Sequence, residues 1–156
     1  MKLKNAIEEY YKMIYHISLE YLRNKEDAED IVQEVFLRYV TYVHEEEKSF
    51  TSKEHEKYWI VRVTINLCCN ELKTSRRKTN TNLDASKAKS YIMPDNELFD
   101  EIQKLGDNYK NVFILHYLED FKISEISEIL DISENNVKTR LKRAREKLKS
   151  GLNIEE

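Results

Sequence analysis

Basic side chains are concentrated near the end of the sequence, where residues 133–149 read SENNVKTRLKRAREKLK. Between Lys138 and Lys149 there are seven Lys or Arg residues and one Glu, although the whole chain has a net charge of −3. Lys and Arg at this density can neutralise phosphates, and Arg, Lys or Asn near a helix start can hydrogen-bond base edges in a major groove. A solvated helix face or a membrane-surface helix would also explain the charge.

The apolar residues of this segment help to separate these alternatives. They recur at steps of four, three and four, at Val137, Leu141, Ala144 and Leu148. This spacing predicts one buried helix face. Residues 124–130 predict a preceding short helix, and residues 131–133 predict the turn between the two helices. Ser133 is expected to be the N-cap of the second helix. The turn lacks the glycine that is often found in turns of this kind. The result is a helix-turn-helix pattern, which favours DNA binding, whereas the small apolar side chains disfavour a membrane surface.

Four residues of the second helix are expected to lie opposite or beside the apolar face and to contact DNA: Lys138, Thr139, Lys142 and Arg143. A second polar and basic stripe is predicted on a helix over residues 57–77. Its members follow one another at steps of three or four: Trp59, Arg62, Asn66, Asn70, Lys73 and Arg77. Arg76 belongs to the same basic run at 73–78. Amides, guanidiniums and an aromatic ring suit an opened or single strand, although a half-buried ring that anchors the core is the favoured explanation for Trp59 alone.

The helix predicted from Asp27 to about Tyr42 has the opposite character. Its first turn is rich in acidic residues, which the helix dipole favours. Its expected exposed face contains Asp30, Gln33, Glu34 and Leu37. An acidic face with an apolar residue would repel DNA, so this helix is expected to bind a protein partner.

The composition predicts an all-α fold, because there are only two Gly and one Pro in a chain that is 35% charged and 40% hydrophobic. A first helix over 3–22 is expected to bury Ile7, Tyr11, Ile14, Ile17 and Tyr21. Residues 44–57 are expected to be mostly loop. The Asn-, Thr- and Ser-rich residues 79–95 predict a flexible linker between two small helical domains, 1–78 and 96–156.

Other classes of protein lack support in the sequence. Cys68 and Cys69 are adjacent and have no partner elsewhere, and the four histidines are scattered, so neither a disulfide scaffold nor a metal site is expected. Neither a cofactor nor a small-molecule substrate is expected, and no nucleophile–base pair indicates an enzyme. The chain also lacks an apolar run of roughly 20 residues, so no membrane insertion is expected and the protein should be intracellular.

Three segments resemble one family. DAEDIVQEVFLRYV (27–40) resembles the most characteristic stretch of the second domain of bacterial sigma-70 factors, above all the small extracytoplasmic-function class. YWIVRVTINLCCNELKTSRRK (58–78) is similar to the promoter −10 recognition helix of that class. ISEISEILDISENNVKTRLKRAREKLK (123–149) is similar to its fourth domain, which reads the −35 element. The three segments occur in the family's order and span nearly the whole chain.

The resemblance implies a promoter-specificity subunit that binds core RNA polymerase and assists DNA melting. It assigns docking on the clamp helices of the largest polymerase subunit to Asp30, Gln33, Glu34 and Leu37. It assigns a −10 contact to Asn66, the phosphate backbone to Arg62, Lys73, Arg76 and Arg77, and −35 reading to Lys138, Thr139, Lys142 and Arg143. The loop at 44–57 precedes the −10 helix, where the class captures a flipped base. An anti-sigma protein is the further partner that the class implies.

Three rival functions predict different behaviour. A stand-alone helix-turn-helix regulator would have no need of DAEDIVQEVF beside a second basic helix. A helical adaptor would not bind DNA at low salt. A phosphodiester enzyme would need a metal cluster, whereas the carboxylates here lie on scattered predicted helices.

Overall fold

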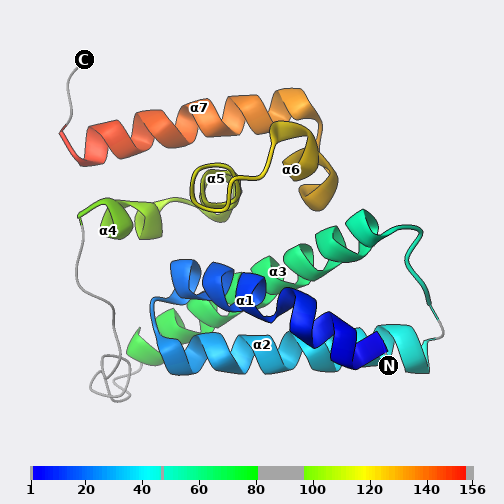
Figure 1. Cartoon of the computed structure of the whole chain (residues 1–156). Coiled ribbons are helices and arrows are strands. Elements are labelled where there is room, and N and C mark those ends of the chain that lie inside the picture. The colour runs from blue at the N-terminus through cyan, green and yellow to red at the C-terminus, as the bar shows by residue number, and fades with distance from the viewer. Residues whose placement is uncertain (1, 47, 81–96, 154–156) are drawn as a thin grey trace. The chain divides into compact units, whose positions relative to one another are not determined.

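The computed structural model describes residues 2–46, 48–80 and 97–153, and for Lys2 and residues 76–80 it describes the backbone alone. Regular structure in these residues is entirely helical, which confirms the predicted fold class (Figure 1). The chain divides into two compact units, residues 1–93 and 94–156. Most of the predicted linker, 79–95, lies outside the described residues.

Unit 1 contains three long helices, α1 (Lys2–Leu22), α2 (Lys25–Val40) and α3 (Lys53–Asn80), and a π-helical turn, η1 (Thr41–Glu45), that extends α2. Each long helix packs against the other two. Their inward side chains are apolar and include Ile14, Ile17, Ile31, Val35, Ile60 and Ile65. Asn24 begins α2 because its Oδ1 accepts a hydrogen bond from the N–H of Asp27 at 3.0 Å.

The two cysteines belong to this core. Cys68 and Cys69 are buried, reduced thiols on α3. Burial raises the pKa of Cys68 to about 12, so this thiol stays protonated at neutral pH.

The prediction for the N-terminal part of α1 is wrong at two positions. Ile7 and Tyr11 are 37% and 42% exposed, whereas Ala6 and Tyr10 are 3% and 4% exposed. The Tyr10 hydroxyl donates a hydrogen bond to Glu56 on α3. This contact favours the orientation of α1 that turns Ala6 and Tyr10 toward the rest of unit 1.

The beginning of α3 also differs from the prediction, since the helix starts at Lys53 rather than near Lys57. Ser52 caps the helix, because its Oγ accepts a hydrogen bond from the N–H of His55 at 3.1 Å. Glu54 and Glu56 occupy the first turn, where the helix dipole favours negative charge. The cap and these acidic residues are a recognisable helix start, but the high charge of the segment hid its periodicity.

Unit 2 contains α4 (Glu97–Lys104), α5 (Asp107–Phe113), a π-helical turn, η2 (Ile114–Leu118), α6 (Ile123–Leu130) and α7 (Glu134–Gly151). The helices α4, α5 and α6 all contact α7. The core between them includes Ile102, Val112, Leu115, Ile126, Ile129 and Leu141. Unit 2 thus uses its last helix as the common support of the other three.

Candidate nucleic-acid and protein interfaces

The helices α6 and α7 form the predicted helix-turn-helix, and Asp131 makes its turn. Asp131 has φ 56° and ψ 50°, in the left-handed region that Asp tolerates better than most residues. The turn is closed by the N–H of Ile132, which donates to the carbonyl of Ser127 at 3.1 Å. Ser133 caps α7 as predicted, accepting at Oγ from the N–H of Asn136 at 3.1 Å. An aspartate therefore takes the place of the frequent glycine.

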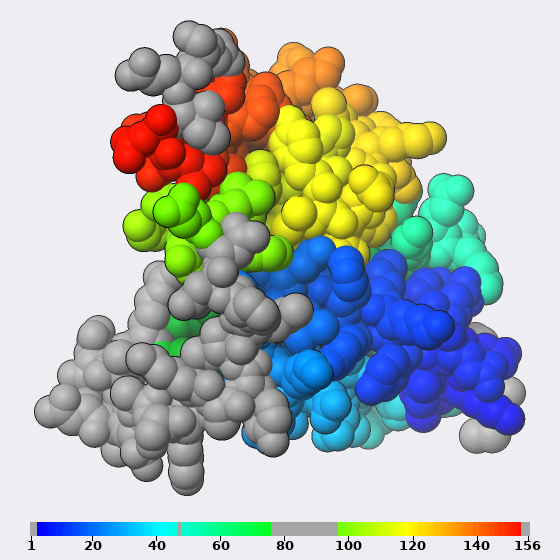
Figure 2. Space-filling model, turned by 60° about the vertical axis from the view of Figure 1, so that its left-hand side comes forward, coloured from blue at the N-terminus to red at the C-terminus, as the bar shows by residue number. Residues whose placement is uncertain are grey.

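The buried face of α7 is the predicted one, made of Val137, Leu141, Ala144 and Leu148. The expected DNA-contacting residues are all exposed: Lys138, Thr139, Lys142 and Arg143. In the space-filling view α7 lies at the surface, coloured orange to red (Figure 2). The helix therefore offers solvent a face rich in cations, opposite and beside its apolar stripe.

Other basic residues of α7 are engaged by aromatic side chains of unit 2. Arg145 Nη1 donates a hydrogen bond to the Tyr117 hydroxyl at 2.8 Å. Lys147 Nζ lies 5.4 Å from the ring centroid of Tyr109. The basic residues of this segment are thus not equally available to DNA. Sequence reasoning did not single out Asn135, which is exposed in the first turn of α7, one turn before Thr139; its position near the helix start is the signal that could have identified it.

The basic stripe of α3 is partly described. Arg62, Asn66, Asn70 and Lys73 are exposed along this helix. The side chains of Arg76 and Arg77 lie outside the described part of the chain. These four residues place two cationic and two amide side chains along one long helix. Such side chains can contact both phosphates and bases.

Trp59 is half-buried in a cluster of aromatic rings rather than freely exposed. Its ring centroid lies 4.8 Å from that of Tyr42, 5.6 Å from that of Phe50 and 6.3 Å from that of Tyr39. Phe50 also stacks on Tyr42 at 5.1 Å. Ring pairs at these separations are favourable, so the cluster fastens the segment around Phe50 to the ends of α2 and α3.

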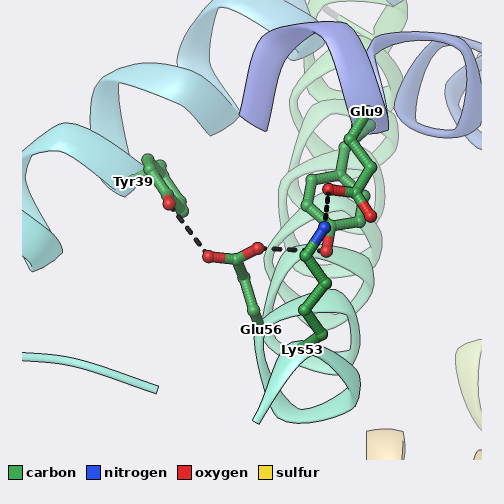
Figure 3. Close-up of polar contacts among 5 residues, drawn as sticks. Glu9, Tyr39, Lys53 and Glu56 are labelled. Atoms are coloured by element: carbon green, nitrogen blue, oxygen red, sulfur yellow. Dashed lines mark hydrogen bonds and ion pairs between the residues drawn. The ribbon is translucent and has the colours of Figure 1, made fainter. Parts of the chain in front are cut away.

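A polar network joins all three helices beside this cluster (Figure 3). The carboxylate of Glu56 accepts hydrogen bonds from Tyr10 at 3.0 Å and from Tyr39 at 2.9 Å. Lys53 Nζ donates to Glu9 Oε2 at 2.6 Å. Burial and then the hydrogen bond to Glu56 raise the pKa of Tyr39 to about 12, and the same causes raise the pKa of Tyr10. The first turn of α3 is thus tied to α1 and α2.

The exposed side of α2 has the predicted acidic and apolar character. Asp30 and Gln33 are exposed, Glu34 is partly exposed, and Leu37 is 63% exposed. Glu34 pairs with Arg38 one turn later, with Oε1 and Nε 3.4 Å apart. An exposed leucine among acids suits contact with a protein better than contact with DNA.

The folds and faces of the two units define a class: a modular, helical protein that combines a DNA-binding helix-turn-helix with a separate unit for further contacts. Residues 6–78 match the family described as Sigma-70 region 2, and residues 95–148 match Sigma-70, region 4. The chain is 30% identical to the ECF RNA polymerase sigma factor SigW of Bacillus subtilis, over 95% of this chain and 87% of SigW. It is 32% identical to the sigma factor SigV of the same organism, over 91% of this chain and 86% of SigV.

A solved structure shares the fold at lower identity. The sigma factor RpoE of Bartonella quintana, in complex with the anti-sigma factor NepR, has a TM-score of 0.68 at 15% identity, with 99% of each chain covered. The two family matches and the 30% identity to SigW show that the chain belongs to the extracytoplasmic-function group of the sigma-70 family, whose members direct promoter recognition by RNA polymerase and are not enzymes. No helix in the described ranges is both long and apolar enough to cross a membrane.

Proposed function

We propose that three helices of this sigma factor have separate binding roles: α7 reads the −35 element, α3 contacts the −10 element, and α2 docks on core RNA polymerase. The observation that carries this proposal is the exposed basic face of α7, held opposite its apolar stripe by the helix-turn-helix. A helix supported in this way can enter the major groove with its first turns against base edges. Asn135 joins Lys138, Thr139, Lys142 and Arg143 as a candidate base contact.

Replacing Arg143 with Ala should weaken binding of the polymerase holoenzyme to a promoter with the preferred −35 element by about 1–3 kcal/mol, if Arg143 reads a base through two hydrogen bonds. The measurement is promoter affinity across a panel of −35 sequences. Arg145→Ala is the matched control, because Arg145 is on the same helix but donates to Tyr117. Equal −35 preference in the Arg143→Ala variant and the unmodified protein would contradict base reading by Arg143.

The −10 contact is assigned to α3, where Asn66 can hydrogen-bond a base while Arg62, Lys73, Arg76 and Arg77 hold the phosphate backbone. A pocket of about 390 Å³ lies beside the start of α3 and is lined by Tyr39, Phe50, Lys53 and Glu56, among others. It offers the partly exposed ring of Phe50 for stacking, together with the hydrogen-bonding side chains of Lys53 and Glu56, a combination that suits a base released from the duplex. We therefore place capture of a melted base here, which would assist strand opening.

Replacing both Gln33 and Glu34 with Ala should weaken binding to core polymerase by about tenfold or more, because both lie on the exposed side of α2 and polar interface contacts of this kind contribute on the order of 1–2 kcal/mol. Co-purification and affinity measurements with core polymerase test this. Glu8→Ala is the control, since Glu8 is exposed on α1. Normal polymerase binding by the double variant, with intact folding, would remove Gln33 and Glu34 from the docking face. The alternative function, a stand-alone helix-turn-helix regulator, predicts instead that the chain binds its promoter in the absence of polymerase.

An anti-sigma protein is proposed as a further partner of this chain. The RpoE structure that shares this fold is a complex with the anti-sigma factor NepR, which supports an anti-sigma protein as a partner of this chain too. The chain is proposed to act in the cytoplasm, where core polymerase and promoter DNA are present. In vitro transcription with core polymerase and a promoter library would test the function as a whole: selective initiation supports it, and no initiation from any promoter would contradict it.

A further inference from the structure

A groove of about 370 Å³ lies between α2 and α3 of unit 1. One wall is formed by Asp30, Glu34 and Arg38 of α2, and the other by Asn70, Glu71 and Thr74 of α3. The apolar side chains of Ile31 and Leu67 also line it. The groove thus adjoins both the acidic face of α2 and the polar stripe of α3.

The charge of the groove is negative. Four of its lining residues are acidic, Asp27, Asp30, Glu34 and Glu71, and one is basic, Arg38. Arg38 is paired with Glu34. Within the described parts of the chain, neither Asp30 nor Glu71 has a basic side chain at ion-pair distance. Such a groove repels phosphate and attracts a cationic side chain.

We propose that this groove extends the polymerase-docking face from α2 onto α3 and receives an Arg or Lys side chain of core RNA polymerase. The inference rests on the proposed function, in which the exposed side of α2 docks on polymerase. Asp30 and Glu34 belong to both surfaces, so the groove is continuous with that face. Leu37, one turn after Gln33 and 63% exposed, supplies an apolar contact beside it. The partner surface should therefore combine a cation with an apolar patch.

Asn70 belongs to the exposed polar stripe of α3. It lines the groove together with Glu71 and Thr74. At about 100° per residue, Asn70 is rotated toward the groove by roughly 60° from Lys73 and by roughly 40° from Asn66. Asn70 therefore contacts polymerase rather than DNA. A negative charge at this position would weaken a DNA contact through repulsion by phosphate, but it would preserve or strengthen a contact with a cation.

The test measures the affinity of the full-length chain for core polymerase. Glu71→Lys should weaken it by about tenfold or more, since a like charge would then face the polymerase cation. Glu71→Gln conserves shape and should weaken it by roughly threefold, which separates loss of charge from any loss of folding. Glu8→Lys makes the same charge change as Glu71→Lys on α1, outside the groove, and should stay within about twofold. Asn70→Asp should bind core polymerase at least as well as the unmodified chain and keep its −10 base preference in the holoenzyme.

The outcomes distinguish this proposal from the one on which it rests. If both Glu71 variants bind like Glu8→Lys while Leu37→Asp loses binding, the groove proposal is overturned and docking through α2 stands. If Leu37→Asp and the Gln33/Glu34 double variant also bind normally, docking through α2 itself is wrong. If Asn70→Asp lowers promoter affinity or changes −10 preference at unchanged polymerase affinity, Asn70 contacts DNA.

Discussion

Glu56→Ala should lower the free energy of unfolding of unit 1 by about 2–4 kcal/mol, because it removes the carboxylate that accepts two hydrogen bonds. The donors, Tyr10 and Tyr39, are only 4% and 2% exposed, so loss of Glu56 leaves two largely buried hydroxyls without their protein acceptor. Loss of these bonds also frees the first turn of α3 from α1 and α2. Base capture in the adjoining pocket should weaken as well.

Chemical denaturation followed by tryptophan fluorescence measures this effect directly, since Trp59 is the only Trp in the chain and lies in unit 1. Glu54→Ala is the matched control: it changes an exposed glutamate in the same helical turn and should alter stability by no more than about 0.5–1 kcal/mol. Similar unfolding curves for the two variants would mean that Glu56 does not hold the three helices together.

The same network sets a pH dependence. The pKa of Tyr39 is raised to about 12 in the folded chain, above the ordinary value of 10.0. Below pH 10 the phenol is neutral in both states, so its contribution to stability is fully present there. As pH rises further, the unfolded chain releases the proton first, so stability falls until the folded phenol also ionises near pH 12. Tyr39→Phe should reduce this alkaline loss of stability.

Leu141→Ala should destabilise unit 2 by about 2–5 kcal/mol, because it leaves a cavity beneath the helix proposed to read DNA. Leu141 is 2% exposed and lies on the face of α7 that the other helices of unit 2 cover. A unit of this size has roughly 3–9 kcal/mol of total stability, so much of the variant should be unfolded at growth temperature. Recognition of the −35 element should be lost, while the docking face in unit 1 remains.

Circular dichroism should show the early loss of helix in this variant, while the Trp59 fluorescence transition stays near that of the unmodified chain. Leu98→Ala, the same substitution at a residue 36% exposed, should cost less than about 1.5 kcal/mol. If the Leu141→Ala variant kept full −35 selectivity and unmodified thermal unfolding, the packing role of Leu141 would be wrong.

The helix-turn-helix was predictable from local sequence signals. The spacing of Val137, Leu141 and Leu148 and the cap at Ser133 depend on residues within a few turns of one another, so the sequence alone predicted both the buried face and the start of α7. The acidic face of α2 and the exposed side chains of α3 followed from the same periodicity. The resemblance of these three segments to one family was confirmed by the matches over residues 6–78 and 95–148.

Contacts between residues distant in sequence decided the rest. The Tyr10–Glu56 and Glu9–Lys53 pairs join positions 46 and 44 residues apart. These contacts connect the first turn of α3 to α1, and they favour the orientation of α1 in which Ile7 is exposed. The hydrogen bond from Arg145 to Tyr117 makes Arg145 less available to DNA than other basic residues of α7 that look equivalent in sequence. The groove beside Asn70 likewise exists only once α2 and α3 pack together. Periodicity within one helix determines which side is apolar, whereas the packing of whole helices determines which polar groups meet.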